Sequence, residues 1–190
     1  MNKPIVMHIP KDKKVIIIEG IAGSGKSTFF KDYKESIKDK MVYAYTEEEL
    51  LFGWRHNFIP GITDVRLRYF EKILDYIDLK LKNEDCIFIL ERFHISLKIF
   101  NWDSPTDFEE RYSKIMSRIK SLPVQVLIFT LESSQIIDRQ VTKEKAWHEY
   151  QELKKRVFGF ANKCDFYLEE QKTILNLASK FNISYSIIKH

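Results

Sequence analysis

The sequence predicts an α/β fold in which a mainly parallel sheet of five strands is flanked by helices, and three observations lead to it. Five short runs of largely β-branched and aromatic residues are apolar at successive positions, as in strands buried inside a parallel sheet. Elsewhere, apolar residues recur at three- and four-residue spacing, which is typical of amphipathic helices. The two patterns alternate along the chain, and such alternation predicts a layered α/β domain.

The expected elements follow one another in a regular order. The strands are predicted at 15–18, 42–45, 87–90, 126–129 and 183–188. Helices are predicted at 28–37, 64–82 and 149–161. A further helix is expected to begin with Ser104 as its cap and Pro105 in its first turn, and to run to Leu122. Because ligands of such folds bind at the carboxyl ends of the strands, the residues that follow each strand are the functional candidates.

Length and composition indicate one domain. The 190 residues are 44% hydrophobic, which is enough for a sizeable core and excludes disordered and collagen-like classes. Residues 14–190 are expected to form a single domain, with 1–13 as a short N-terminal arm. The N-terminal apolar stretch is broken by Pro4, His8 and Pro10, so it does not form a signal peptide, and no run reaches the length of a membrane span.

The charges and cysteines also restrict the function. The net charge of +4 is small and scattered, so neither a nucleic acid nor a membrane is expected as a partner, although an anionic small ligand fits. Cys86 and Cys164 form no C-x-x-C motif, and no histidine is spaced for metal binding. Reduced thiols in a cytoplasmic protein are therefore expected.

Three of the six glycines, Gly20, Gly23 and Gly25, follow the first strand within six residues. They belong to a complete G-x-x-x-x-G-K-[ST] motif between a strand and a helix, and this context predicts a loop whose backbone N–H groups surround phosphate oxygens. The expected phosphate-binding residues are Gly20, Ile21, Ala22, Gly23, Ser24, Gly25, Lys26, Ser27 and Thr28. In a solvent-facing cradle, Lys26 would reach the β- and γ-phosphates of ATP, and the Ser27 hydroxyl would bind Mg²⁺.

Glu91 and Arg92 end the third predicted strand. A carboxylate beside a phosphate-binding loop is where Mg²⁺ or its water is held, so Glu91 is the second metal candidate. Arg92 would place a fixed cation near the transferred phosphoryl group or the acceptor.

The chain resembles the deoxynucleoside kinase and thymidylate kinase superfamily from residue 14 to about 160. The resemblance rests on Glu19 and Gly20 at the start of the loop, and on Glu91 and Arg92 with Ser96 four positions beyond the arginine. It implies a three-layer P-loop NTPase fold. It also implies a phosphotransferase that moves the γ-phosphoryl group of ATP to a nucleoside or a nucleoside monophosphate.

The same resemblance implies roles on the acceptor side. An acidic residue after the second strand acts as base toward a nucleoside hydroxyl. Position favours Glu47, whereas the spacing to Trp54 favours Glu49, and both assignments stay open. Arg66 and Arg68 lie where the thymidylate branch holds the acceptor's monophosphate. Segment 138–147, with Arg139, is expected as a lid that closes over the phosphates, and a homodimer through helices such as 64–82 is the assembly implied.

Other functions remain to be weighed. Asn162, Lys163, Cys164 and Asp165 match the guanine-recognition motif N-K-x-D, but they follow a predicted helix and no D-x-x-G motif accompanies them, so a GTPase is rejected. A kinase for a polynucleotide end, a sugar or an antibiotic remains an alternative, as does a nucleotide-binding module without catalysis. A polynucleotide acceptor would require a continuous basic stripe, and here the lysines alternate with acids.

Overall fold

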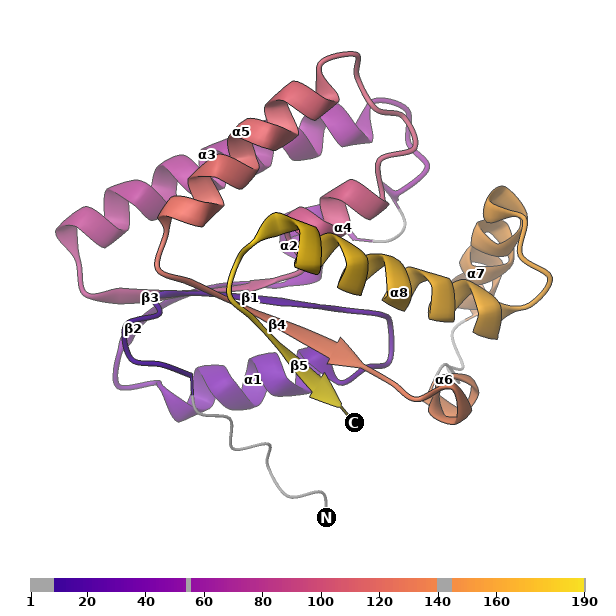
Figure 1. Cartoon of the computed structure of the whole chain (residues 1–190), viewed down its shortest axis with the longest axis horizontal. Coiled ribbons are helices and arrows are strands. Elements are labelled where there is room, and N and C mark those ends of the chain that lie inside the picture. The colour runs from indigo at the N-terminus through magenta and orange to yellow at the C-terminus, as the bar shows by residue number, and fades with distance from the viewer. Residues whose placement is uncertain (1–8, 54–55, 140–144, 190) are drawn as a thin grey trace.

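The computed structural model describes residues 9–53, 56–139 and 145–189 and contains one five-stranded sheet (Figure 1). The strands are β1 (Val15–Gly20), β2 (Met41–Tyr45), β3 (Cys86–Glu91), β4 (Val124–Thr130) and β5 (Tyr185–Lys189). Their order across the sheet is β2-β3-β1-β4-β5, and every neighbouring pair is parallel. The predicted α/β class and strand number are confirmed.

Eight helices connect these strands within the described residues. They are α1 (Lys26–Ser36), α2 (Glu47–Leu51), α3 (Ile62–Asn83), α4 (His94–Ile99), α5 (Phe108–Ser121), α6 (Ser133–Arg139), α7 (Lys145–Phe158) and α8 (Lys163–Phe181). The prediction for the start of α5 was wrong. Ser104 Oγ donates to the Asn101 carbonyl and Phe108 N to the Pro105 carbonyl, so this segment forms turns, and Asp107 is the N-cap of the helix.

The molecule has three layers. Helix α1 lies against one face of the sheet, where Phe29 and Phe30 pack with Ile16, Ile18 and Phe129. Helices α3, α4, α5 and α8 lie over the opposite face, as Figure 1 shows, and together with that face they enclose the larger of the two hydrophobic cores.

The two edge strands, β2 and β5, depart from the prediction that every strand is buried on both faces. The central strands β1, β3 and β4 are buried throughout, whereas Tyr185 and Ile187 of β5 are exposed. This exposure arises because each edge strand has one neighbour only, β3 for β2 and β4 for β5. Among the described residues, no helix combines the length and the apolar character that crossing a bilayer requires.

The strand order brings the loops after β1 and β3 together. Ile18 of β1 is paired with Glu91 of β3, and Arg92 N donates to the Ile18 carbonyl at 2.8 Å. The glycine-rich loop and the Glu91-Arg92 pair therefore lie side by side at the carboxyl edge of the sheet. Lys26 and Glu91 are 65 positions apart in the sequence.

Candidate active site

The loop after β1 has the backbone that its glycines predict. Gly20 has φ +143°, and a Cβ at this position would lie 2.4 Å from the Phe129 carbonyl oxygen of β4. Gly25, with φ +92°, is the N-cap of α1. Both conformations disfavour residues with side chains, and at Gly20 the missing Cβ lets the loop lie close to β4.

Lys26 lies inside this loop. Its side chain is buried, which corrects the expectation of a solvent-facing cradle, and Nζ donates to the Ile21 carbonyl at 2.8 Å. Ser24 Oγ donates to the same carbonyl at 2.8 Å. Burial and then the charge of Arg92 lower the pKa of Lys26 to about 8. An anion placed in the loop would favour its charged form.

Ser27 and Glu91 come together as predicted for a metal site. Ser27 Oγ donates to Glu91 Oε1 at 2.5 Å, joining the first turn of α1 to the end of β3. A hydroxyl and a carboxylate are oxygen ligands of the kind that Mg²⁺ takes when nucleotide phosphates and waters complete its shell. This pair therefore fits the predicted ion. Thr28, the next loop residue, is exposed on α1.

Arg92 is buried and occupies the left-handed region of the backbone, with φ +65°. This strained conformation turns the chain sharply after β3. Its Nε donates to Glu47 Oε2 at 2.8 Å, and its Nη1 donates to Ser96 Oγ at 3.3 Å. Burial by itself would lower the pKa of Arg92, but the negative charges of Glu47 and Glu170 raise it, so the guanidinium stays charged.

Glu19 fixes the segment that follows Arg92. Its Oε1 accepts hydrogen bonds from the backbone N–H groups of Phe93, Ile95 and Ser96 at 2.9, 3.2 and 3.4 Å. Its Oε2 accepts from Ser96 Oγ at 2.6 Å. Although burial raises the pKa of Glu19, these hydrogen bonds favour the carboxylate. The serine four positions beyond Arg92 thus links β1 to the arginine, a role that the sequence motif did not reveal.

The structure separates the two carboxylates that follow β2. Glu47 contacts Arg92, whereas Glu49 Oε2 accepts from Thr46 N at 2.7 Å and from Thr46 Oγ1 at 2.9 Å in the capping box of α2. Burial works to raise the pKa of Glu47, but the charges of Arg92 and Lys26 outweigh it and lower the value. Of these two carboxylates, Glu47 is therefore the one that lies at the phosphate loop.

A pocket of about 260 Å³ opens at this place. Its lining residues are Ala22, Ser27, Thr46, Glu47, Glu48, Glu91 and Arg92. They come from the loops after β1, β2 and β3, so the pocket lies at the carboxyl edge of the sheet, as expected for this fold class.

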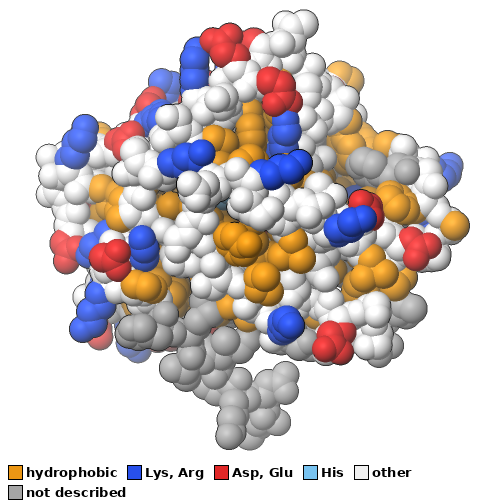
Figure 2. All heavy atoms as spheres, in the orientation of Figure 1, with side chains coloured by type: hydrophobic (Ala, Val, Ile, Leu, Met, Phe, Trp, Pro, Cys, Tyr) orange, Lys and Arg blue, Asp and Glu red, His pale blue; other side chains and the backbone are white. Residues whose placement is uncertain are grey.

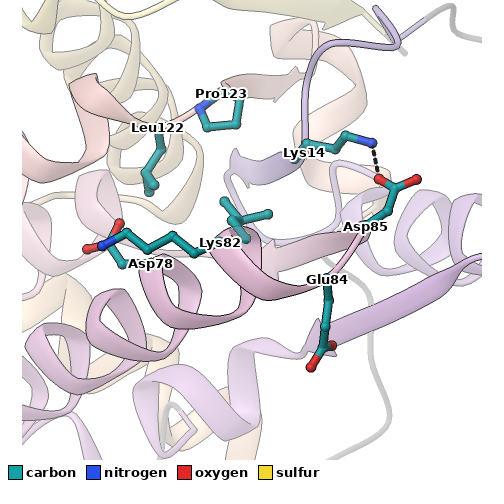
Figure 3. A pocket seen from close by; sticks show the side chains of 8 residues that line it. Lys14, Asp78, Lys82, Glu84, Asp85, Leu122 and Pro123 are labelled. Atoms are coloured by element: carbon teal, nitrogen blue, oxygen red, sulfur yellow. Dashed lines mark hydrogen bonds and ion pairs between the residues drawn. The ribbon is translucent and has the colours of Figure 1, made fainter.

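A second pocket, of about 330 Å³, lies at the opposite edge, before β1, β3 and β4 (Figure 3). Lys14 and Asp85 form an ion pair there at 2.6 Å, beside Leu122 and Pro123. Neither a glycine-rich loop nor a helix N-terminus contributes to its lining, so the first pocket is the candidate active site.

Arg66 and Arg68 point in different directions from α3. Arg66 is fully buried, and its Nη2 donates to the Leu51 carbonyl at 2.6 Å and to Asn57 Oδ1 at 2.5 Å. It thereby holds the end of the helix that begins with Glu47. Arg66 Nη1 makes no hydrogen bond within the described part of the chain. Arg68 is exposed and pairs with Asp64 at 2.8 Å, outside this cluster.

The remaining predicted site residues fall partly outside the described residues. Trp54 and residues 140–144 of the predicted lid lie outside the described residues. The backbone of Arg139 ends α6, and α7 resumes at Lys145. The N-terminal arm is described only from residue 9.

The N-K-x-D match has a structural explanation. Asn162 is the N-cap of α8, and its side chain accepts from Asp165 N at 2.9 Å. The four residues therefore begin a helix that follows another helix, which agrees with the rejection of a GTPase.

The chain was compared with known proteins. No model of a protein family matches it, and neither does any curated protein sequence. Solved structures do match. The YorR protein from Bacillus subtilis, in complex with phosphorylated GDP, is 18% identical, with a TM-score of 0.55 over 92% of this chain and 85% of that chain. Deoxyadenosine kinase from M. mycoides with bound dATP is 14% identical, with a TM-score of 0.56 over 92% and 90%. Thymidylate kinase from Candida albicans is 15% identical, with a TM-score of 0.56 over 93% and 83%. The chain therefore has the three-layer α/β fold of these solved structures.

Proposed function

We propose that this protein is a phosphotransferase that uses ATP and Mg²⁺ to phosphorylate a nucleoside or a nucleoside monophosphate. The observation that carries the proposal is the convergence of the phosphate loop with the Glu47–Arg92 pair, since Lys26, Ser27, Glu91 and Arg92 all lie around one edge of the sheet. The kinase folds that the chain shares support it.

The donor side is formed by the loop and α1. Backbone N–H groups of the loop residues bind the phosphate oxygens, and Lys26 exchanges its bond to the Ile21 carbonyl for a phosphate oxygen. Ser27 and Glu91 would hold Mg²⁺ or its waters, and the bound ion neutralises charge on the phosphates. Phosphoryl transfer needs little covalent chemistry from the protein, so these residues act by positioning and by charge.

The acceptor side begins at Glu47. Its carboxylate orients the acceptor hydroxyl and takes up its proton, while Arg92 stabilises the negative charge on the transferring group. Of the two arginines predicted to hold an acceptor phosphate, Arg66 has a buried Nη1 with no hydrogen-bond partner among the described residues, whereas Arg68 pairs with Asp64 on the surface. We therefore propose Arg66 as the acceptor-side cation and leave Arg68 out of the site.

The distribution of charge on one face of the molecule supports a small-molecule acceptor over a polynucleotide. On the face seen in Figure 2, lysine and arginine side chains are interspersed with aspartate and glutamate, with no continuous basic stripe. A polynucleotide acceptor requires such a stripe for its phosphates.

A screen of nucleosides and nucleoside monophosphates with γ-labelled ATP and Mg²⁺ tests the proposal. We expect label transfer to at least one acceptor, and we expect Lys26→Met to abolish transfer while its circular dichroism spectrum stays that of the wild type. A well-folded protein that binds ATP but labels no acceptor of the panel would overturn the proposed function. Transfer to a sugar or an oligonucleotide alone would replace the acceptor class.

A further inference from the structure

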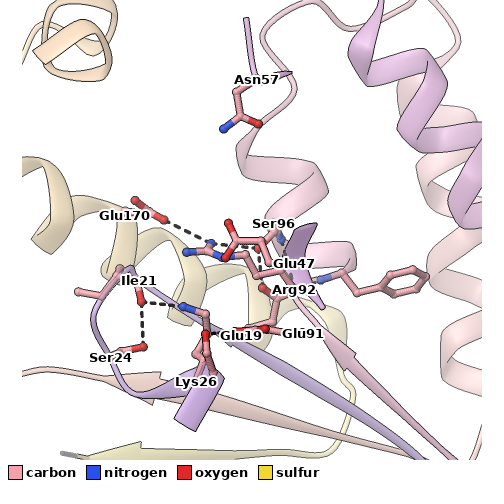
Figure 4. Close-up of polar contacts among 12 residues, drawn as sticks. Glu19, Ile21, Ser24, Lys26, Glu47, Asn57, Glu91, Arg92, Ser96 and Glu170 are labelled. Atoms are coloured by element: carbon pink, nitrogen blue, oxygen red, sulfur yellow. Dashed lines mark hydrogen bonds and ion pairs between the residues drawn. The ribbon is translucent and has the colours of Figure 1, made fainter. Parts of the chain in front are cut away.

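The guanidinium of Arg92 is held on two of its three nitrogens. Nε donates to Glu47, and Nη1 donates to Ser96 and lies 3.7 Å from Glu170 Oε1 (Figure 4). Nη2 makes no hydrogen bond with any residue of the described ranges. The neighbours of Arg92 thus fix its plane and leave Nη2, with its two N–H donors, for a ligand.

Glu170 reaches Arg92 from α8, which belongs neither to the phosphate loop nor to the Glu91-Arg92 motif. Its side chain is 2% exposed, and neither carboxylate oxygen has a hydrogen-bond partner among the residues that the structure describes. Two cations face it instead, Arg92 at 3.7 Å and Lys154 of α7 at 3.6 Å. Burying a carboxylate without compensating charge is strongly unfavourable, so the two flanking cations stabilise Glu170 at this position.

Lys154 has further contacts of its own. Its Nζ lies 4.3 Å from the ring centroid of Phe166, 5.3 Å from that of Phe100 and 5.4 Å from that of Tyr150. At such distances the faces of aromatic rings attract a cation. Because the rings hold the ammonium group independently, Lys154 can serve as a fixed point for Glu170.

We propose that Glu170 is a positioning residue for the phosphoryl-transfer site: anchored by Lys154, it holds the Nη1 side of Arg92 so that Nη2 faces the reacting groups. The inference rests on the proposed function, in which Glu47 turns from Arg92 to the acceptor hydroxyl. At that moment Arg92 loses its shortest side-chain hydrogen bond, and Ser96 and Glu170 keep it oriented, together with the ring of Phe100, whose centroid lies 5.5 Å from Arg92 Cζ.

Steady-state kinetics of Glu170→Gln test this role, since the change removes the charge and keeps the shape. We expect kcat to fall about 10- to 100-fold, the range caused by small misplacements of a catalytic group, with the KM for ATP unchanged. The matched control is Glu169→Gln, because Glu169 neighbours Glu170 but is exposed and paired with Lys172 at 3.5 Å. A wild-type kcat in Glu170→Gln would overturn the proposal.

Two further variants separate positioning from stability. Lys154→Met removes the anchor but keeps the charge of Glu170 beside Arg92, so it is expected to lower kcat, and by less than Glu170→Gln does. The double variant Glu170→Gln/Lys154→Met removes one charge of each sign, so its thermal stability is expected to return toward that of the wild type while kcat stays low. If kcat recovered together with stability, Glu170 would only balance Lys154, and the proposal would be wrong.

A spectroscopic measurement tests the positioning role of Glu170 independently of the proposed function. Side-chain ¹⁵N NMR, with the Arg92 signal assigned from Arg92→Lys, reports how freely the guanidinium rotates. We expect restricted rotation in the wild type and in Glu169→Gln, and faster rotation in Glu170→Gln. Identical rotation in all three would refute the positioning role even if phosphotransfer were established. Conversely, the expected change without any phosphotransfer would contradict the proposed function alone.

Discussion

Arg92 donates from Nε to Glu47 Oε2 at 2.8 Å, and this one hydrogen bond joins the end of β3 to the first turn of α2. Arg66 holds the other end of the same short helix through the Leu51 carbonyl. The helix that carries the proposed acceptor-orienting carboxylate is therefore held at both ends, each by a buried arginine. Four predictions follow from this arrangement and from the burial around it.

Changing Glu47 to glutamine should lower kcat, whereas changing Glu49 to glutamine should not. Loss of an acid–base group lowers rates by about 10²- to 10⁴-fold, and we expect Glu47→Gln to lower kcat within this range. Glutamine can replace glutamate in a capping box, so Glu49→Gln should keep the kcat of the wild type. Steady-state kinetics of both variants decide the assignment, and a larger loss in Glu49→Gln would reverse it.

ATP binding should weaken above the pKa of Lys26. In the ligand-free protein this value is about 8, and a bound triphosphate raises it because opposite charge favours the ammonium form. Below pH 8 the lysine is already charged, so affinity should be flat there. Above pH 8 a proton must be taken up on binding, and affinity should fall by up to about tenfold per pH unit.

Calorimetry at pH 8.5 in buffers of different ionisation enthalpy measures this proton uptake directly. Lys26→Met, which has no titrating group, should show none of it. Equal uptake in the variant and the wild type would assign the proton to another group.

Gly20→Ala should destabilise the protein far more than Gly159→Ala. Both glycines have positive φ, +143° and +71°, so both substitutions strain the backbone, but only at Gly20 would the new Cβ meet a carbonyl oxygen, at 2.4 Å. Backbone strain of this kind costs roughly 1–3 kcal/mol, and overpacking adds a similar amount at Gly20. Urea unfolding measures both values, and equal losses would mean that β4 moves aside without penalty.

His94 should make the protein sensitive to acid. It is buried, Nδ1 has no hydrogen-bond partner among the described residues, and burial lowers its pKa to about 3. Between pH 6.5 and 3 the unfolded chain binds a proton that the folded protein does not, so folding stability falls as pH falls.

From pH 7.5 to 5 this contribution is about 2 kcal/mol, calculated from the ordinary histidine pKa. The urea-unfolding free energy of His94→Gln should therefore drop less over this interval than that of the wild type, by about the same 2 kcal/mol. Equal drops in the two proteins would show that His94 becomes protonated without unfolding.

Much of the fold and of the phosphate loop could be predicted from residue types at short spacing in the sequence. Apolar runs identify buried strands because a parallel sheet covers both faces of its inner strands, and β1, β3 and β4 were placed correctly. The glycine-rich loop was recognisable because its positive φ values exclude most other residues. The contact between Ser27 and Glu91 could also be expected, since both follow strands of one parallel sheet.

Predictions from short sequence patterns were wrong where the local structure depends on contacts with residues elsewhere in the chain. Ser104 and Pro105 look like a helix start, yet their polar groups close turns, and α5 begins only at Phe108. The apolar run of β5 gave no sign that the strand would lie at an edge. Lys26 was expected in solvent, and the loop encloses it instead.

The sequence by itself determined the α/β class, the phosphate loop and the carboxylate–arginine pair that follows β3, because each depends on residue type at short spacing. Only the tertiary structure decided that Glu47, and not Glu49, contacts Arg92, since this depends on how α2 sits against β3. It alone also brought Glu170 and Lys154 to the arginine. In a helical sequence such charged residues resemble solvent-facing ones, and their burial arises from the packing of α7 and α8.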